Sequence, residues 1–212
     1  MPVKPGAVID PAATRSHIVE TSERIFYQRG IAAVGVADIA SEARTSKASI
    51  YKNFGSKDGL VEATLAYRSE QVHRWLIEGT AQLPPGRERV LGVFDLLLEW
   101  YAQDDFRGCA ILNAAAEQRV SNPIVTRLAR QHLQAYRDFL TASLTEAAFP
   151  EPRQLAARLL ILIEGATVIS AIDGNPAAGQ QARALADRLL TAAEPPNTPE
   201  RPPTRRRSAP RR

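Results

Sequence analysis

The sequence predicts an all-α protein built from two helical units. Along most of the 212 residues, apolar side chains recur at the three- and four-residue spacings of amphipathic helices. No segment alternates apolar and polar residues convincingly, as a half-buried strand would. Prolines and glycines interrupt the helical pattern, most firmly at residues 83–86. We therefore expect about three helices in the first unit and about six in the second.

The N-terminal unit contains three predicted helices. The first runs from about Thr14 to Arg29, and the second is a short amphipathic helix that begins at Val36. Ser46 is a suitable N-cap for the third helix, which spans Lys47–Asn53. A fourth, longer helix over about 57–78 then leads into the second unit.

Five further helices are predicted after the break at 83–86. They span about Arg87–Gln103, Cys109–Arg119, Pro123–Ala148, Glu151–Ile172 and Pro176–Ala193. From residue 194 onward, prolines and arginines replace large apolar residues, so we expect this tail to be disordered.

Composition narrows the class of protein. The net charge is +4, and the tail from 194 to 212 supplies all of it, because six arginines there face two glutamates. One cysteine, Cys109, excludes a disulfide framework and fits a cytoplasmic location. The apolar segment 155–172 contains Arg158 and Glu164, so we interpret it as a buried or interface helix and expect no membrane span. The N-terminus does not have the pattern of a signal peptide.

The second and third predicted helices suggest a nucleic-acid reader. Two short helices joined by a short turn form the arrangement that places one helix in a DNA major groove. The candidate recognition helix, Ser46–Asn53, points Ile50 inward and presents hydrogen-bonding side chains outward. Such a distribution suits phosphate contacts combined with limited base readout.

The run from Ile25 to Leu60 resembles the N-terminal domain of the tetracycline-repressor (TetR) family. The matching residues are Phe26, Gly30, Val36, Ile39, Ala40, Ala43, Ser46, Lys47, Ile50, Tyr51, Phe54, Ser56, Lys57 and Leu60. The segment with Arg107, Gly108, Cys109, Asn113 and Glu117 also resembles one common subgroup of the family, although more weakly.

The resemblance implies a domain organisation and a set of DNA-contacting residues. It implies a helix-turn-helix DNA-binding domain at 14–56 and a ligand-binding and dimerisation domain at 57–193, between a leader at 1–13 and the tail at 194–212 that composition predicts to be disordered. Tyr51 and Lys57 would hold phosphates. The full set of implied DNA-binding residues is Arg44, Thr45, Ser46, Lys47, Ser49, Tyr51, Lys52, Asn53 and Lys57.

The chain departs from the family pattern at two positions. The second helix has Val34 and Gly35 where the family has a Ser or Thr cap, and this costs about 1 kcal/mol or less if glycine is the cap. The turn that usually contains glycine has Arg44, for which a positive φ is unfavourable. Either the turn differs slightly, or Arg44 accepts strain and gains a phosphate contact.

The second unit offers a candidate effector site. His132 and Tyr136 lie one turn apart on an otherwise apolar helix face, where they are either hydrogen-bonded core residues or cavity-lining residues. Cys109 is interpreted first as a small buried hydrophobe rather than a redox sensor. The candidate ligand-binding residues are Phe94, Tyr101, Cys109, Asn113, His132 and Tyr136.

The last two helices suggest a dimer interface. Their apolar stripes are suited to a four-helix contact between two copies of the chain. The candidate interface residues are Leu162, Gly165, Ala166, Ile169, Leu185 and Leu189. Glu164 lies within this apolar helix and needs a partner, for which an interhelical or cross-dimer ion pair ranks ahead of a ligand.

These expectations combine into a homodimer that binds a palindromic double-stranded DNA operator. A small apolar or amphipathic effector would bind the second unit and release the DNA, and by family resemblance the outcome is repression. No cofactor, metal or catalytic activity is expected, since the three histidines fall in different predicted helices and form no catalytic motif. The alternatives are a helical enzyme or ligand carrier, and a regulator without an effector. The arginine-rich tail either aids solubility or adds nonspecific DNA attraction.

Overall fold

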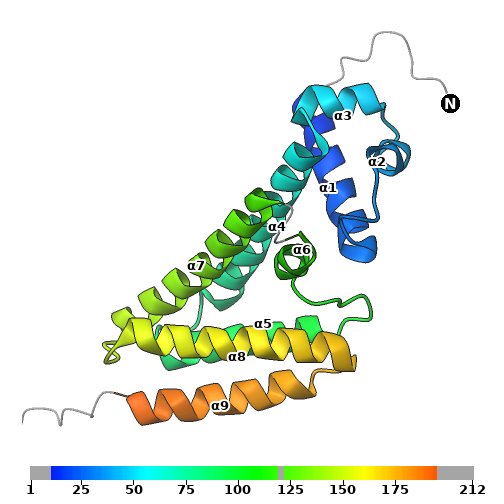
Figure 1. The fold of residues 1–212 in the computed structure, drawn as a ribbon. Coiled ribbons are helices and arrows are strands. Elements are labelled where there is room, and N and C mark those ends of the chain that lie inside the picture. The colour runs from blue at the N-terminus through cyan, green and yellow to red at the C-terminus, as the bar shows by residue number, and fades with distance from the viewer. Residues whose placement is uncertain (1–10, 119–121, 195–212) are drawn as a thin grey trace, which may run out of the picture.

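The computed structural model describes residues 11–118 and 122–194, which form helices joined by turns (Figure 1). The helices are α1 (Pro11–Arg29), α2 (Val36–Glu42), α3 (Lys47–Phe54), α4 (Lys57–Thr80), α5 (Arg87–Tyr101), α6 (Ala110–Gln118), α7 (Pro123–Glu146), α8 (Pro152–Asp173) and α9 (Ala177–Ala193). Within the described ranges there is no strand, and the predicted all-α class is confirmed.

Helix boundaries differ from the prediction by a few residues. α1 begins at Pro11 rather than Thr14, because proline is well tolerated at the first helical position, where no amide donor is needed. α5 and α7 end about two residues early, and α6 begins at Ala110. The predicted end of α6 at Arg119 lies outside the described residues. So do residues 1–10 of the predicted leader and 195–212 of the predicted tail.

The helices form an elongated molecule with the N-terminal unit at one end (Figure 1). α1, α2 and α3 form the reader domain there. α4 and α7 run side by side from the reader domain to a layered group made of α5, α8 and α9 (Figure 1). α6 lies against α4 and α7, between the two ends of the molecule.

Two hydrophobic cores stabilise the two ends. The reader core contains Ile18, Ile39 and Ile50, and Ala114 of α6 and Val125 of α7 complete it. The second unit therefore closes the core of the first.

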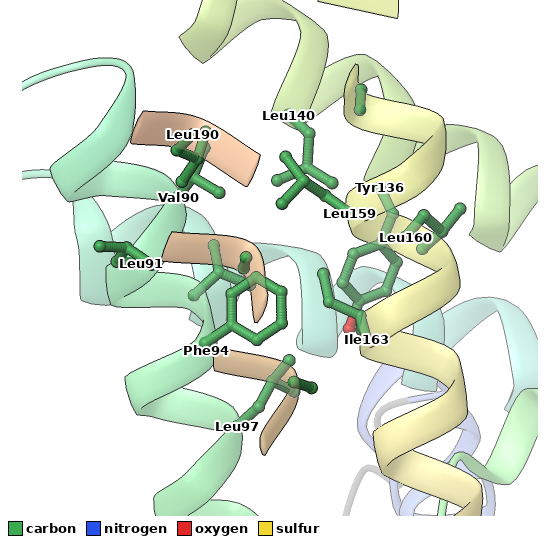
Figure 2. Packing of buried hydrophobic residues seen from close by; sticks show 14 of the residues in the cluster. Val90, Leu91, Phe94, Leu97, Tyr136, Leu140, Leu159, Leu160, Ile163 and Leu190 are labelled. Atoms are coloured by element: carbon green, nitrogen blue, oxygen red, sulfur yellow. The ribbon is translucent and has the colours of Figure 1, made fainter. Parts of the chain in front are cut away.

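The larger core lies among α5, α7, α8 and α9 (Figure 2). Figure 2 shows Phe94 among Leu91, Leu97 and other apolar side chains of this core. Phe94 is 2% exposed. Phe94 does not line the outer cleft or the inner cavity described below, so its predicted role at a ligand site stays a prediction.

α8 is the most apolar long helix of the described chain. It is the one described helix whose length and composition would allow it to cross a membrane. Leu155, Leu159 and Ile163 on one face lie in the larger core, against neighbouring helices. Figure 2 shows Leu159 and Ile163 in this position. This packing fits the interpretation of α8 as a core helix.

Candidate functional site

α3 presents a polar surface because a single apolar residue anchors it. Ile50 is fully buried in the reader core. Lys47, Tyr51 and Lys52 are exposed, and the Tyr51 side chain retains 49% of its accessible surface. The structure therefore places three of the predicted DNA-contacting side chains together on the outer face of one helix.

The turn before α3 keeps the geometry that normally requires glycine. Arg44 has φ +50°, the left-handed conformation. The Thr45 amide donates to the Ala40 carbonyl at 2.9 Å, and the Arg44 amide donates to the Ser41 carbonyl at 3.2 Å. This bond pair is a Schellman motif, in which arginine occupies the position where glycine is usual. Of the two alternatives for Arg44, the structure has the usual turn with a strained arginine backbone rather than a different turn. The Arg44 side chain is exposed, and its contact with a phosphate stays a prediction.

α2 begins without a side-chain cap, as its sequence predicts. Gly35 is the N-cap, and the Asp38 carboxylate accepts a hydrogen bond from the Gly35 amide at 2.8 Å. This contact forms half of a capping box and satisfies one donor at the helix start. Asp38 therefore offsets part of the missing cap.

Three predicted DNA-contacting residues have polar groups engaged within the protein. The Ser46 hydroxyl accepts from the Ser49 amide at 3.0 Å, and the Asn53 amide group donates to the Ser49 carbonyl at 2.8 Å. The Lys57 ammonium donates to the Ile31 carbonyl at 2.8 Å, which ties the start of α4 to the loop after α1. The sequence predicted the capping role of Ser46 but did not reveal the internal partners of Asn53 and Lys57.

Sequence reasoning also missed Arg15. Its guanidinium lies 4.3 Å from the centre of the Phe54 ring and donates to the Asn53 carbonyl. The side chain is exposed beside the C-terminal end of α3. It adds a cation to the outer surface of the reader domain, and only the tertiary structure reveals this position.

In the second unit, a cluster of polar side chains joins α4 to α7. The His132 ring lies 2.8 Å from the Ser69 hydroxyl and 3.1 Å from the His73 ring nitrogen. The other nitrogen of His132 lies 3.6 Å from the Cys109 sulfur. Burial lowers the pKa of His132 to about 3, and the charges of His73 and Arg68 add to this effect. His132 is therefore neutral at physiological pH.

Tyr101 and Tyr136 frame the same region. The Tyr101 hydroxyl lies 2.7 Å from the Thr167 hydroxyl, and the Tyr136 ring packs edge-on to His132 with centroids 5.3 Å apart. Glu164 lines this space as well. Its Oε2 atom is buried and has no hydrogen-bond partner among the described residues. Burial raises the pKa of Glu164 to about 7, and the charge of Arg137 opposes the rise only in part.

These side chains enclose a small inner cavity of about 10 Å³, room for no more than one water. A larger outer cleft of about 360 Å³ lies between α4 and α5, lined by residues that include Trp75, Glu99 and Trp100. Arg68, Val72 and Trp100 line both spaces, so the two are adjacent.

The predicted ligand set divides between these spaces and other parts of the structure. Cys109, His132 and Tyr136 line the inner cavity, and Tyr101 adjoins it through Thr167. Asn113 is instead exposed and donates to the Arg107 carbonyl at 2.8 Å. The predicted set did not include the other residues that line the inner cavity, which are Arg68, Val72, Trp100, Ala110, Ile111, Glu164 and Thr167, although a ligand was considered as a second-ranked partner of Glu164.

The raised pKa of Glu164 gives a testable dependence of stability on pH. Between pH 4.5, the ordinary value, and about 7, the folded chain retains a proton that the unfolded chain has lost. The Glu164 contribution to stability therefore falls as pH rises through this range. We expect Glu164→Gln to gain on the order of 2 kcal/mol of unfolding free energy relative to the wild type between pH 5 and pH 8. Urea unfolding at fixed protein concentration measures this difference, and a difference that is independent of pH would contradict the assignment.

α6 connects this region to the reader domain at two points. At its N-terminal end, the Tyr27 hydroxyl accepts from the Arg107 amide at 2.7 Å and donates to the Gly108 carbonyl at 3.1 Å. Near its C-terminal end, the Glu117 carboxylate accepts from the amides of Ile31 and Ala32 at 3.1 and 2.6 Å. Cys109, which precedes α6, lines the inner cavity. Any displacement of α6 therefore acts on α1, on the loop after it and on the cavity.

The outer surface of α8 and α9 is apolar. We define the α8–α9 face by its exposed large side chains, which are Ile161, Val168, Ile169, Ile172 and Leu185. Ile161 and Ile172 expose 72% and 78% of their surface. Of the predicted interface residues, Gly165, Ile169 and Leu185 are exposed, and Leu162 and Leu189 are partly buried. Ala166 is 4% exposed and packs in the larger core, which sequence periodicity could not reveal.

The fold defines a helix-turn-helix protein with a second, larger helical unit. Two family models match the chain: "Bacterial regulatory proteins, tetR family" over residues 18–64, and "Tetracyclin repressor-like, C-terminal domain" over residues 86–186. The chain belongs to the tetracycline-repressor family of bacterial transcriptional regulators, which are not enzymes.

Individual relatives agree with this assignment. The chain is 46% identical over 52 residues to the HTH-type transcriptional regulator TtgR of Pseudomonas putida, a match covering 24% of this chain and 25% of TtgR. It is 30% identical over 107 residues to the HTH-type transcriptional repressor NemR of Escherichia coli, covering 49% of this chain and 53% of NemR. These alignments thus span a quarter to about half of the relatives.

Among solved structures, SCO4454, a TetR-family transcriptional regulator from Streptomyces coelicolor, superimposes with a TM-score of 0.78 at 25% identity. The match covers 87% of this chain and 97% of that structure. The similarity to this structure thus extends over nearly the whole described fold.

Proposed function

We propose that this protein is a homodimeric, cytoplasmic repressor that binds a palindromic operator and is released from it by a small molecule. The observation that carries the proposal is the placement of α3. A helix-turn-helix unit anchored by the buried Ile50 presents Lys47, Tyr51 and Lys52 on one exposed face. The dimensions of a major groove admit such a helix, and its amino-terminal side chains are those that reach base edges.

The predicted DNA-contacting residues fall into two groups, according to whether their side chains are hydrogen-bonded within the protein. Lys47, Tyr51, Lys52 and the strained Arg44 have exposed side chains and would contact phosphates and bases. Ser46, Asn53 and Lys57 would serve mainly to shape and hold the reader, since their side-chain polar groups bond within it, whereas Ser49 takes part in these bonds only through its backbone and its hydroxyl would keep the DNA-contacting role. Thr45 is partly buried in the turn and would contact DNA only through close approach of the backbone.

Dimerisation would bring two readers to one operator. The α8–α9 face exposes large apolar side chains that need a cover in water, and a second copy would supply the same surface. Two-fold symmetry of the protein would then match a palindrome whose half-sites lie one DNA turn, or a multiple of it, apart.

Effector release would pass through α6 and Arg68. Arg68 of α4 lines both the outer cleft and the inner cavity, and its guanidinium lies 3.2 Å from the carboxylate of Glu23 in α1. A molecule entering the cleft would displace Arg68 or α6, both of which hold the reader domain. Release requires that the molecule bind the rearranged state more tightly than the DNA-binding state.

Footprinting on an enriched operator tests this function. Genomic fragments retained by the full-length protein are isolated in the presence of excess nonspecific competitor DNA and probed with hydroxyl radicals. We expect two protected half-sites related by two-fold symmetry, with centres about 10.5 base pairs or a multiple of that apart. Failure to enrich any fragment over competitor, or protection of a single asymmetric segment, would contradict the proposal.

A further inference from the structure

We propose that the effector is an amphipathic cation whose apolar body lies in the outer cleft and whose protonated amine binds Glu164. This inference rests on the proposed function, because it assigns a ligand class to the second unit. It derives from the shape of the cleft and from one unsatisfied carboxylate.

The outer cleft suits a small aromatic or aliphatic body. Its volume of about 360 Å³ falls within the range of ligand sites in proteins. The rings of Trp75 and Trp100 pack edge to face with their centroids 6.5 Å apart. The Trp100 ring also packs edge to face against the Phe106 ring, with centroids 4.8 Å apart. Aromatic faces of this kind attract cations as well as apolar groups.

Glu164 supplies the polar end of the site. Its buried Oε2 atom has no partner among the described residues, although a buried carboxylate ordinarily has one. Arg137 acts on Glu164 electrostatically, but the described residues include no ion pair between them. A ligand ammonium would satisfy this carboxylate with a charge-assisted hydrogen bond.

The neighbouring groups do not replace such a ligand. His132 is neutral, the Tyr101 hydroxyl is bonded to Thr167, and burial keeps the Cys109 thiol protonated by raising its pKa to about 12. Glu99 adds a second carboxylate to the outer cleft. An anionic ligand would therefore meet two acids, whereas a neutral one would leave Glu164 unpaired.

Arg68 is the cation of the described chain that lines both spaces, and its position favours coupling rather than blocking entry. Its guanidinium is directed to α1, where it pairs with Glu23 at 3.2 Å and lies 5.7 Å from the centre of the Tyr27 ring. The inner cavity holds about 10 Å³, so an ammonium group must widen it to reach Glu164. That widening moves Val72, Trp100 or Arg68, and the last of these contacts the reader domain directly.

Three probes with one apolar body separate charge from shape. They are 4-phenylbutylamine, 4-phenylbutanol and 4-phenylbutyrate, and they are titrated into the full-length dimer. The two tryptophans of the chain, Trp75 and Trp100, both line the outer cleft, so intrinsic fluorescence reports binding there. We expect the amine to bind about 10- to 100-fold more tightly than the alcohol, and the acid to bind most weakly.

Glu164→Gln preserves the shape and removes the charge. It should weaken amine binding about 10- to 100-fold and leave alcohol binding unchanged, which also shows that the variant is folded. Glu88→Gln, which replaces an exposed acid in the first turn of α5, is the matched control and should retain the preference for the amine.

Equal binding of the amine and the alcohol to the wild type, or no binding of either, would overturn the inference. So would a preference for the amine that survives in Glu164→Gln.

Operator release is measured in parallel by gel shift. Release by the alcohol without any preference for the amine would leave the proposed function intact, whereas failure of the wild type to bind operator would remove the proposed function itself.

Discussion

Replacing Ile169 with aspartate is expected to convert the proposed dimer into monomers and to weaken operator binding at least about 100-fold. Ile169 is 49% exposed at the α8–α9 face, which includes the still more exposed Ile161 and Ile172. An aspartate there would have to be desolvated without a partner when two copies associate, and this penalty opposes assembly. Loss of the second reader removes the effective-concentration advantage of bivalent binding, which amounts to about 10²–10⁴.

Mass measurement by light scattering together with operator titration checks this expectation. Ile77→Asp is the matched control, since Ile77 is 52% exposed but belongs to α4 rather than to the α8–α9 face. The control should remain dimeric and bind DNA normally. A dimeric Ile169→Asp variant with full affinity would show that the copies associate through another surface.

The helices and their boundaries could be predicted largely from sequence because the signals are local. Apolar periodicity indicated each helix, and the N-caps Ser46 and Ser56 fixed the starts of α3 and α4, where each hydroxyl accepts an amide three residues on. At Arg44 the sequence left open a slightly different turn or a strained arginine, and the positive φ of Arg44 shows the strained backbone.

Roles that depend on tertiary contacts could not be predicted in this way. The phosphate role expected of Lys57 stays a prediction, but the sequence could not show that the loop after α1 comes close enough for the Ile31 carbonyl to accept a hydrogen bond from its ammonium. Phe94 and Tyr101 are seven residues apart on one helix face, and periodicity indicates that both are buried without saying in which environment. Only the packing of α5 shows that Phe94 belongs to the core and Tyr101 adjoins the inner cavity.

Glu164 shows both the strength and the limit of the sequence argument. A carboxylate within an apolar helix indicated that a partner was required, and an ion pair ranked first. The structure instead directs Glu164 to the inner cavity and leaves Oε2 without a partner among the described residues. The ligand interpretation that ranked second therefore became the basis of a testable proposal.

The second large effect concerns the recognition helix. Lys47 and Tyr51 are exposed on α3, and neither side chain has a hydrogen-bond partner in the described structure that would compete with DNA. Replacing both with alanine removes two contacts from each of two readers while Ile50 continues to anchor the helix. Because each contact contributes about 1 kcal/mol or more, we expect the operator affinity of the Lys47→Ala/Tyr51→Ala variant to fall at least about 100-fold.

Salt dependence provides a second measure of the same contact. If Lys47 neutralises one phosphate per protomer, the slope of log affinity against log salt should become shallower by about two in the double variant. Arg188→Ala, which removes an exposed cation from α9, is the control and should change neither the affinity nor the slope appreciably. Thermal unfolding should be similar for all three proteins, since none of the replaced side chains is buried.

The DNA-reading role of α3 is tested most directly by titrating one enriched operator fragment with the wild type, the double variant and Arg188→Ala at a single stated salt concentration. Wild type and Arg188→Ala should bind alike, and Lys47→Ala/Tyr51→Ala should bind at least about 100-fold more weakly. Equal retention of the fragment by the double variant would contradict the assignment of α3 as the DNA-reading helix.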